Sequence, residues 1–264
     1  MSQRQQRWPP GAIFCPNRGE VGANLWAWSL TGSVPWGSRP ISVEGSQVAW
    51  QRNVGVEQFL DQHQLEWLLC LDSDMAPEWD QLPRLLASDR PVVSALCLTR
   101  GFPFPTTAWA AADRVYRVTD LVDAMAADAT LPAPGLPLVA VGTGALLIWR
   151  DVLERMASPW FRCGQVDPQL LQEDTNFCDR AAAAGFPPAV VTGARVGHRT
   201  GGVTLWPGAD GRVWAQWAAT EDVRSPIRIR EDEEVLHERQ RQAVAAARLN
   251  GRESAIVADA GSRR

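Results

Sequence analysis

Short apolar runs alternate with helix-like segments along most of this chain of 264 residues. Residues 12–15, 67–71 and 92–98 are almost continuously apolar, and a polar or Pro-containing segment follows each of them. Such runs are typical of strands that are buried on both faces, as in parallel sheets. Residues 46–62 and 172–184 have the apolar spacing of helices. The pattern predicts an α/β fold with a central, mostly parallel sheet flanked by helices.

Weaker signals complete the predicted element order. Further strands are expected at 40–44, 138–141, 188–192 and 195–197, a helix at 21–30, and Ser46 as the cap of the helix after the second strand. Residues 223–264 contain no aromatic residue, and their acidic positions precede their basic ones, which suits a helix dipole. We therefore predict a domain over 1–222 and a charged helical tail over 223–264 with a frayed end.

Composition narrows the class of protein only a little. All 26 basic residues are Arg, and the chain has 13 Trp. A GC-rich genome accounts for most of this bias. The net charge of −4 argues against a protein that coats nucleic acid, although it leaves room for a local Arg-lined groove. Five Cys without metal spacing indicate a reducing cytoplasm, and no signal peptide or membrane-spanning run is evident.

Two carboxylates one residue apart follow the second apolar run. Asp72 and Asp74 come directly after 67–71, and ligands bind at the carboxyl ends of strands in open parallel sheets. Such a pair can hold Mg²⁺ or Mn²⁺, which prefer oxygen ligands and often bridge to substrate phosphates. The alternative is a simple turn in which one Asp caps the next helix. The position after a buried strand favours the metal interpretation.

A second acidic pair opens the helix at 172–184. Asp174 shares one helix face with Cys178 and Ala181, so we expect it to look into a cleft, where it could act as a general base. The alternative is that Glu173 and Asp174 only compensate the helix dipole.

Two Gly-flanked segments are further candidates. His198 follows a short strand at a Gly-flanked turn and is either a metal ligand or an ordinary loop residue. Gly142 and Gly144 flank Thr143 and would allow a ligand to approach the backbone closely. The segment lacks the complete G-x-G-x-x-G pattern of dinucleotide sites.

Taken in order, these clusters resemble the GT-A glycosyltransferases, above all the small family-two-type enzymes that are frequent in bacteriophage genomes. The resemblance covers about residues 12–200, and it rests on the order and spacing of modest motifs. The motifs are Pro16-Asn17-Arg18-Gly19-Glu20, Arg52-Asn53, Leu71-Asp72-Ser73-Asp74-Met75, Gly142-Thr143-Gly144, Glu173-Asp174-x-x-Phe177 and Gly197-His198. The chain lacks the Q-x-x-R-W segment and the membrane helices of larger, processive members.

The resemblance implies an inverting transfer of a sugar from a nucleoside-diphosphate sugar, most often a UDP-sugar, to an acceptor hydroxyl. It implies Mn²⁺ or Mg²⁺ as cofactor, with Asp72, Asp74 and His198 as ligands and Asp174 as catalytic base. The donor would contact Asn17, Arg18, Glu20, Arg52, Asn53, Asp72, Gly142, Thr143 and Gly144.

The acceptor stays open at this point. Some phage relatives are associated with hydroxymethylated pyrimidines in DNA, whereas others modify proteins or surface glycans. An Arg-lined groove would suit DNA, but the same side chains are equally compatible with a solvated surface. Its members would be Arg100, Arg114, Arg117, Arg195, Arg199 and Arg212.

Three Trp near the predicted cleft, at 109, 160 and 206, are candidates for stacking on a sugar or base, with core packing as the alternative. Two other classes of protein also remain, a sugar nucleotidyltransferase and a non-catalytic sugar-binding module.

Overall fold

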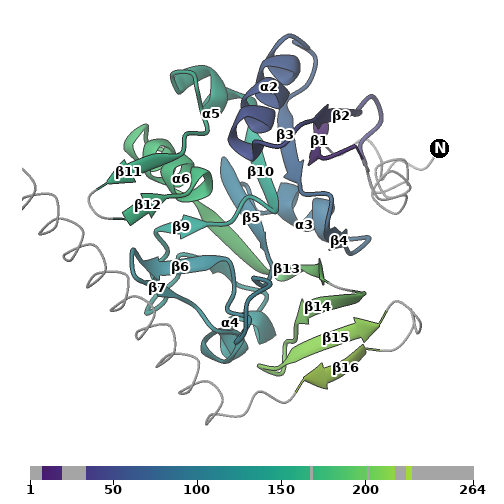
Figure 1. Cartoon of the computed structure of the whole chain (residues 1–264), viewed down its shortest axis with the longest axis vertical. Coiled ribbons are helices and arrows are strands. Elements are labelled where there is room, and N and C mark those ends of the chain that lie inside the picture. Colours follow the sequence, from purple (N-terminus) through teal and green to yellow (C-terminus); the bar gives the residue numbers. More distant parts are fainter. Residues whose placement is uncertain (1–7, 20–33, 167–168, 201, 218–223, 228–264) are drawn as a thin grey trace, which may run out of the picture.

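The computed structural model describes residues 8–19, 34–166, 169–200, 202–217 and 224–227. Within these ranges the fold is mixed α/β, built around one large twisted sheet (Figure 1). The central strands are β1 (Ala12–Asn17), β2 (Arg39–Glu44), β3 (Trp67–Leu71), β5 (Val92–Leu96), β10 (Ala145–Trp149) and β13 (Ala189–Thr200). The main helices are α2 (Val48–Leu60), α3 (Gln81–Ala87), α5 (Arg150–Arg155) and α6 (Glu173–Ala183).

The direction of the strands differs from the prediction. The central order is β2-β1-β3-β10-β5-β13. The pairs β1–β2, β1–β3 and β5–β13 are parallel, but β10 runs antiparallel to both of its neighbours. The expectation of a mostly parallel sheet is therefore wrong. A continuous apolar run indicates that a strand is covered on both faces. An antiparallel strand at the centre of a sheet can be covered on both faces as well, so the run does not give the strand direction.

The sheet is covered on both faces, which explains the continuous runs. On one face α2, α5 and α6 contribute to a core that includes Phe59, Leu153 and Phe177. On the other face α3 packs Leu82 and Leu85 against the strands. Successive residues of β3 alternate between the two cores, as the pleat of a strand requires.

The sheet extends beyond β13 through three antiparallel strands, β14 (Val203–Pro207), β15 (Val213–Trp217) and β16 (Arg224–Ile227). β16 pairs with β15, so the sheet continues across the boundary expected at residue 222. The rest of the expected helical tail lies outside the described residues, as does the helix expected at 21–30.

Smaller elements complete the described chain. The short strands are β4 (Met75–Pro77), β6 (Ala108–Ala111), β7 (Arg114–Val115), β8 (Thr130–Leu131), β9 (Ala140–Val141), β11 (Gly164–Val166) and β12 (Gln169–Leu171). A 3-10 turn, η2 (Val118–Leu121), leads into α4 (Val122–Ala126). Among the described residues, none of the helices has the length and apolar character needed to cross a bilayer.

Two local predictions need correction. The N-cap of α2 is Gln47 without a side-chain cap, so Ser46 does not cap this helix. The two short strands expected at 188–192 and 195–197 form the single long strand β13, whose register with β5 shifts between Val191 and Arg195.

Candidate functional site

The acidic turn that follows β3 is fixed by backbone contacts on two sides. The N–H of Asp72 donates to the carbonyl of Gly144 at 3.0 Å, and the N–H of Met75 donates to the carbonyl of Asp72 at 2.9 Å. β4 then pairs with β13, which sets Met75 opposite His198. The N–H of Arg199 also donates to the carbonyl of Asp74 at 2.8 Å. This pairing brings His198 to the acidic turn, although the two are far apart in the sequence.

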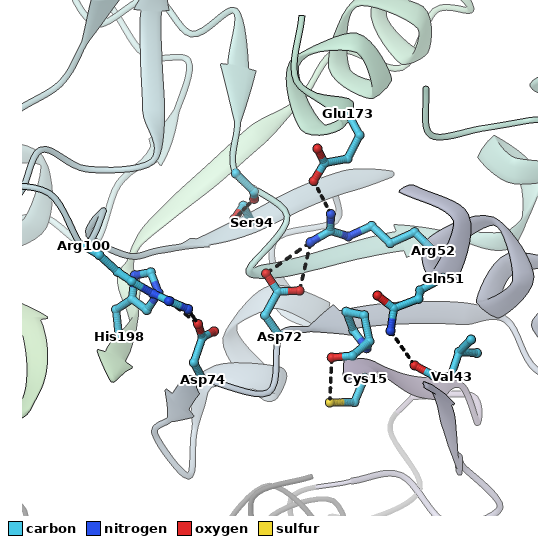
Figure 2. Close-up of polar contacts among 12 residues, drawn as sticks. Cys15, Val43, Gln51, Arg52, Asp72, Asp74, Ser94, Arg100, Glu173 and His198 are labelled. Atoms are coloured by element: carbon cyan, nitrogen blue, oxygen red, sulfur yellow. Dashed lines mark hydrogen bonds and ion pairs between the residues drawn. The ribbon is translucent and has the colours of Figure 1, made fainter. Parts of the chain in front are cut away.

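Asp74, Arg100 and His198 form an open ion-pair cluster at this point (Figure 2). His198 Nε2 lies 3.4 Å from Asp74 Oδ2. The Arg100 guanidinium contacts Asp74 Oδ2, and its Nε donates to His198 Nε2 at 2.9 Å. The Arg100 side chain is 57% exposed. An exposed cation therefore lies beside the two side chains that could donate lone pairs to a metal.

The tautomer of His198 follows from its contacts. Nδ1 lies 2.7 Å from the carbonyl oxygen of Leu98, which can only accept, so Nδ1 carries the proton and donates it. Burial, with help from the nearby Arg100 charge, holds the pKa of His198 below its ordinary value. The ring is therefore neutral at pH 7, and the Nε2 lone pair accepts the hydrogen bond from Arg100 beside Asp74. This is the tautomer that a His ligand uses when its other nitrogen is held by a carbonyl.

Asp72 belongs to a different, buried ion-pair cluster with Arg52 and Glu173 (Figure 2). One terminal nitrogen of Arg52 donates to both carboxylate oxygens of Asp72, at 2.9 and 3.1 Å. The other donates to Glu173 Oε1. Arg52 thus joins the acidic turn after β3 to the first turn of α6.

Arg52 is enclosed on its remaining sides. The residue is 1% exposed, and its guanidinium carbon lies 5.9 Å from the centre of the Phe161 ring. Phe161 in turn stacks on Phe177 of α6. The resemblance implies that Arg52 contacts the donor, but here both terminal nitrogens face carboxylates. Arg52 organises the acids of the site in this arrangement.

The side chain of Asn53 also makes its hydrogen bonds within the protein. Its Nδ2 donates to the carbonyl of Phe161 at 2.8 Å, and its Oδ1 accepts from the N–H of Phe161 at 3.0 Å. This pair of hydrogen bonds fixes the ring beside Arg52. Asn53 thus supports the buried cluster, and its expected contact with the donor stays a prediction.

Asp174 lies beside the buried cluster, on the first turn of α6. Its Oδ1 accepts from the N–H of Thr175 at 2.7 Å. Desolvation raises the pKa of Asp174 above its ordinary value, and the neighbouring Glu173 adds to the rise, whereas Arg52 opposes it. A carboxylate with a raised pKa binds a proton more tightly than a solvated one, as a general base requires.

The Gly142–Gly144 turn lies against the acidic turn, and packing accounts for its glycines. A Cβ on Gly142 would come within 2.7 Å of Thr107 Cβ, and one on Gly144 within 2.6 Å of Met75 Cε. Thr143 is only 3% exposed. The buried Ser94 hydroxyl lies within hydrogen-bond distance of the carbonyl of Gly142, at 3.1 Å. Close approach between protein segments therefore accounts for the two glycines, and the expected contact of this turn with the donor stays a prediction.

The end of β1 is held by a polar network. Asn17 is buried; its Nδ2 donates to Ser42 Oγ at 2.8 Å, and its Oδ1 accepts from the N–H of Gly19 at 2.9 Å. Gln51 donates to the carbonyl of Asn17 at 2.7 Å and was not expected from the sequence. Arg18 is exposed at this edge, and Glu20 lies outside the described residues.

The three Trp candidates pack in or against the core. Trp160 is 6% exposed and donates to the carbonyl of Leu153 at 2.8 Å, and Trp206 is 5% exposed. Neither ring is open for stacking, so core packing is their role. Trp109 is partly buried against the core.

The buried thiols offer no nucleophile. Burial raises the pKa of Cys15, Cys70, Cys97 and Cys178 to about 12, so each stays protonated at pH 7. A covalent route through these cysteines is therefore not supported.

The predicted metal ligands only partly form a site for a hard divalent cation. Among the described residues, no group of three or more His, Cys, Asp and Glu side chains is arranged to hold a metal. Two of the three predicted ligands, Asp74 and His198, do converge, and a cation of the protein, Arg100, stands at that point. Mg²⁺ is often bound by one or two carboxylates plus substrate phosphates, so the carboxylate of Asp74 fits this ion when the donor supplies its phosphates. Asp72 is directed to Arg52 instead.

No family model matches the chain, and no curated protein matches it. The structure is similar to the crystal structure of A197 from STIV, with a TM-score of 0.55 and 16% identity over 84% of this chain and 98% of that one. This likeness concerns the fold alone.

A second similar structure is that of a glycosyltransferase involved in the glycosylation of the major capsid of PBCV-1. It has a TM-score of 0.38 and 12% identity over 69% of this chain and 82% of that one, which is too distant to carry an argument.

Proposed function

We propose that the protein is a metal-dependent glycosyltransferase that moves a sugar from a nucleoside-diphosphate sugar to an acceptor hydroxyl. The observation that carries the proposal is the meeting of Asp74 with neutral His198 at the end of β3, linked through Asp72 and Arg52 to the helix that bears Asp174. The mixed α/β fold is compatible with the GT-A-like fold that the sequence motifs suggest.

Asp74 and His198 would hold Mn²⁺ or Mg²⁺ through a carboxylate oxygen and Nε2. When bound, the cation would neutralise the charge that develops on the leaving nucleoside diphosphate. Leu98 would keep the His198 ring in the required tautomer through its carbonyl. Asp72 would remain beside Arg52, where it supports the turn that presents Asp74.

Asp174 would accept the proton of the acceptor hydroxyl. The acceptor oxygen forms a bond to the anomeric carbon while the bond from that carbon to the diphosphate oxygen breaks. The proton goes to Asp174, and the electron pair of the broken bond leaves with the nucleoside diphosphate. The raised pKa of Asp174 supports this role, because it makes the carboxylate a stronger base.

The donor is proposed to be a UDP-sugar and the acceptor a hydroxymethylated pyrimidine in DNA, both on the motif resemblance to phage enzymes. Proteins and glycans are tested beside DNA, since no contact in the structure favours one of them. The experiment incubates the protein with Mn²⁺, a panel of UDP-sugars and hydroxymethylated DNA, and then digests the DNA to nucleosides for mass measurement. Release of nucleoside diphosphate is followed in parallel.

Asp74→Asn and Asp174→Asn are the test variants, and Asp61→Asn is the matched control because Asp61 is exposed at the far end of α2. We expect metal-dependent diphosphate release in the wild type and in Asp61→Asn, and its loss in the other two. Diphosphate release with no mass gain in DNA but a gain in protein or glycan would remove the DNA acceptor. Pyrophosphate release from nucleoside triphosphates would favour a nucleotidyltransferase.

A further inference from the structure

We infer that Arg100 is a built-in counter-cation of the Asp74–His198 site, which a divalent cation displaces and which then binds the diphosphate of the donor. This inference rests on the proposed function and adds a residue to it. It starts from the open ion-pair cluster, where one guanidinium contacts both Asp74 and His198.

The contacts of Arg100 are those that a metal would make. Its Nε donates to His198 Nε2 at 2.9 Å, and it also contacts Asp74 Oδ2, so it uses the same two lone pairs that a metal would need. A guanidinium and a divalent cation cannot both occupy that position, because both are cations and the two acceptors lie 3.4 Å apart. Binding of the ion therefore requires Arg100 to leave.

Arg100 is able to leave at small cost. Its side chain is 57% exposed and sits on the loop between β5 and β6, whereas the Arg52 side chain in the neighbouring cluster is 2% exposed. Exposed ion pairs contribute little to stability, so water can replace the lost contact. Until the cation arrives, Arg100 neutralises the charge of Asp74 and donates to His198 Nε2.

The released guanidinium stays close to where phosphates would bind. A divalent ion on Asp74 and His198 would bridge to the donor phosphates. Arg100 would then lie within a side-chain length of those oxygens, and its planar fork suits a bidentate contact with phosphate. Arg100 would thus neutralise Asp74 while no divalent cation is bound, and it would contact the donor diphosphate once the cation is in place.

The test measures Mn²⁺ binding to the full chain by electron paramagnetic resonance, without donor or acceptor. We expect Arg100→Ala to bind Mn²⁺ roughly five-fold more tightly than the wild type, because the competing charge is gone. Arg100→Lys, which keeps the charge, should bind with an affinity between those two. Arg90→Ala is the matched control, since Arg90 is exposed just before β5, at the opposite end from Arg100. It should bind like the wild type.

A second measurement adds UDP in saturating Mn²⁺. We expect Arg100→Ala to bind UDP several-fold more weakly, while Arg90→Ala is unchanged. Equal Mn²⁺ affinity in Arg100→Ala and wild type would overturn the displacement, and unchanged UDP affinity would overturn the phosphate contact. If no variant binds Mn²⁺, the metal dependence of the proposed function fails together with the displacement. Mn²⁺ binding that is insensitive to Arg100 would remove only this inference.

Discussion

Asp72 and Asp74 are separated by one residue, yet the arginines that pair with them are of opposite kinds. In the buried ion-pair cluster, Arg52 is enclosed and holds Asp72 and Glu173 together. In the open ion-pair cluster, Arg100 is exposed and contacts Asp74 beside His198. The first arginine is part of the framework of the site, and the second stands where a ligand would bind.

The contrast shows how one short turn can serve two purposes. Asp72 meets α2 and α6 through the buried Arg52. Position 74 faces β13 and the loop after β5. Burial makes a charge pair hard to break, because a lone charge left inside is strongly destabilised, whereas solvent replaces an exposed partner. Asp72 can therefore contribute to stability while Asp74 exchanges its partner for a ligand.

The largest expected effect comes from the same substitution made in both clusters. Arg52→Met should lower the free energy of unfolding by about 3 kcal/mol or more, because two largely shielded carboxylates lose their partner. Arg100→Met should lower it by less than about 1 kcal/mol. Urea unfolding followed by circular dichroism measures both values. Equal losses would mean that burial does not separate the two clusters.

Next in size is the effect of removing the base beside the buried cluster. Asp174→Asn should reduce the initial rate of transfer by about 10³-fold, in the range that general bases contribute. In the wild type the rate should rise with pH as Asp174 loses its proton. The midpoint should lie above the ordinary Asp value of 3.8, because burial raises the pKa of Asp174.

His198 could also make the rate fall at acid pH, and the two causes can be separated by experiment. Protonation of His198 would also lower the rate at acid pH, but through the metal, so Mn²⁺ binding is measured over the same range. A rate of Asp174→Asn that falls in parallel with the wild type at acid pH would assign the limb to another group. We expect that variant to show no such limb once metal binding is taken into account.

A smaller effect separates the two glycines beside Asp72. Gly142→Ala should destabilise the protein by about 2 kcal/mol, because its Cβ would meet the branched Cβ of Thr107 at 2.7 Å. Gly144→Ala should cost about 1 kcal/mol, because it meets the flexible end of Met75. Thermal unfolding compares the two variants. The reverse order would show that the turn holding the Asp72 N–H, and not side-chain packing, sets the cost.

Much of the fold could be predicted from the sequence, because apolar runs record burial directly. Apolar runs carry no information on strand direction, so they could not show that β10 is antiparallel to β3 and β5. The neighbourhood of Asp74 and His198 depends on the pairing of β4 with β13, which no local pattern encodes. The motif resemblance, and not periodicity, suggested that these two residues meet.

The buried role of Arg52 left a signal in the sequence. Arg52 shares one face of α2 with Val56 and Phe59, at spacings of four and seven residues, and both of these are fully buried. A charged residue on the apolar face of a helix needs a partner of opposite charge, which here is supplied by Asp72 and Glu173. The partners could not be named in advance, because they come from a distant strand end and a distant helix.

The smallest expected effect is the response of the two clusters to salt. The Debye length falls from about 10 Å at 0.1 M salt to about 3 Å at 1 M, which screens exposed pairs far more than buried ones. The stability difference between wild type and Arg100→Met should therefore shrink toward zero in 1 M NaCl. The difference between wild type and Arg52→Met should persist, since solvent ions cannot reach a guanidinium that is 2% exposed. Urea unfolding at both salt concentrations measures the two differences, and a loss of both in high salt would contradict the shielding assigned to Arg52.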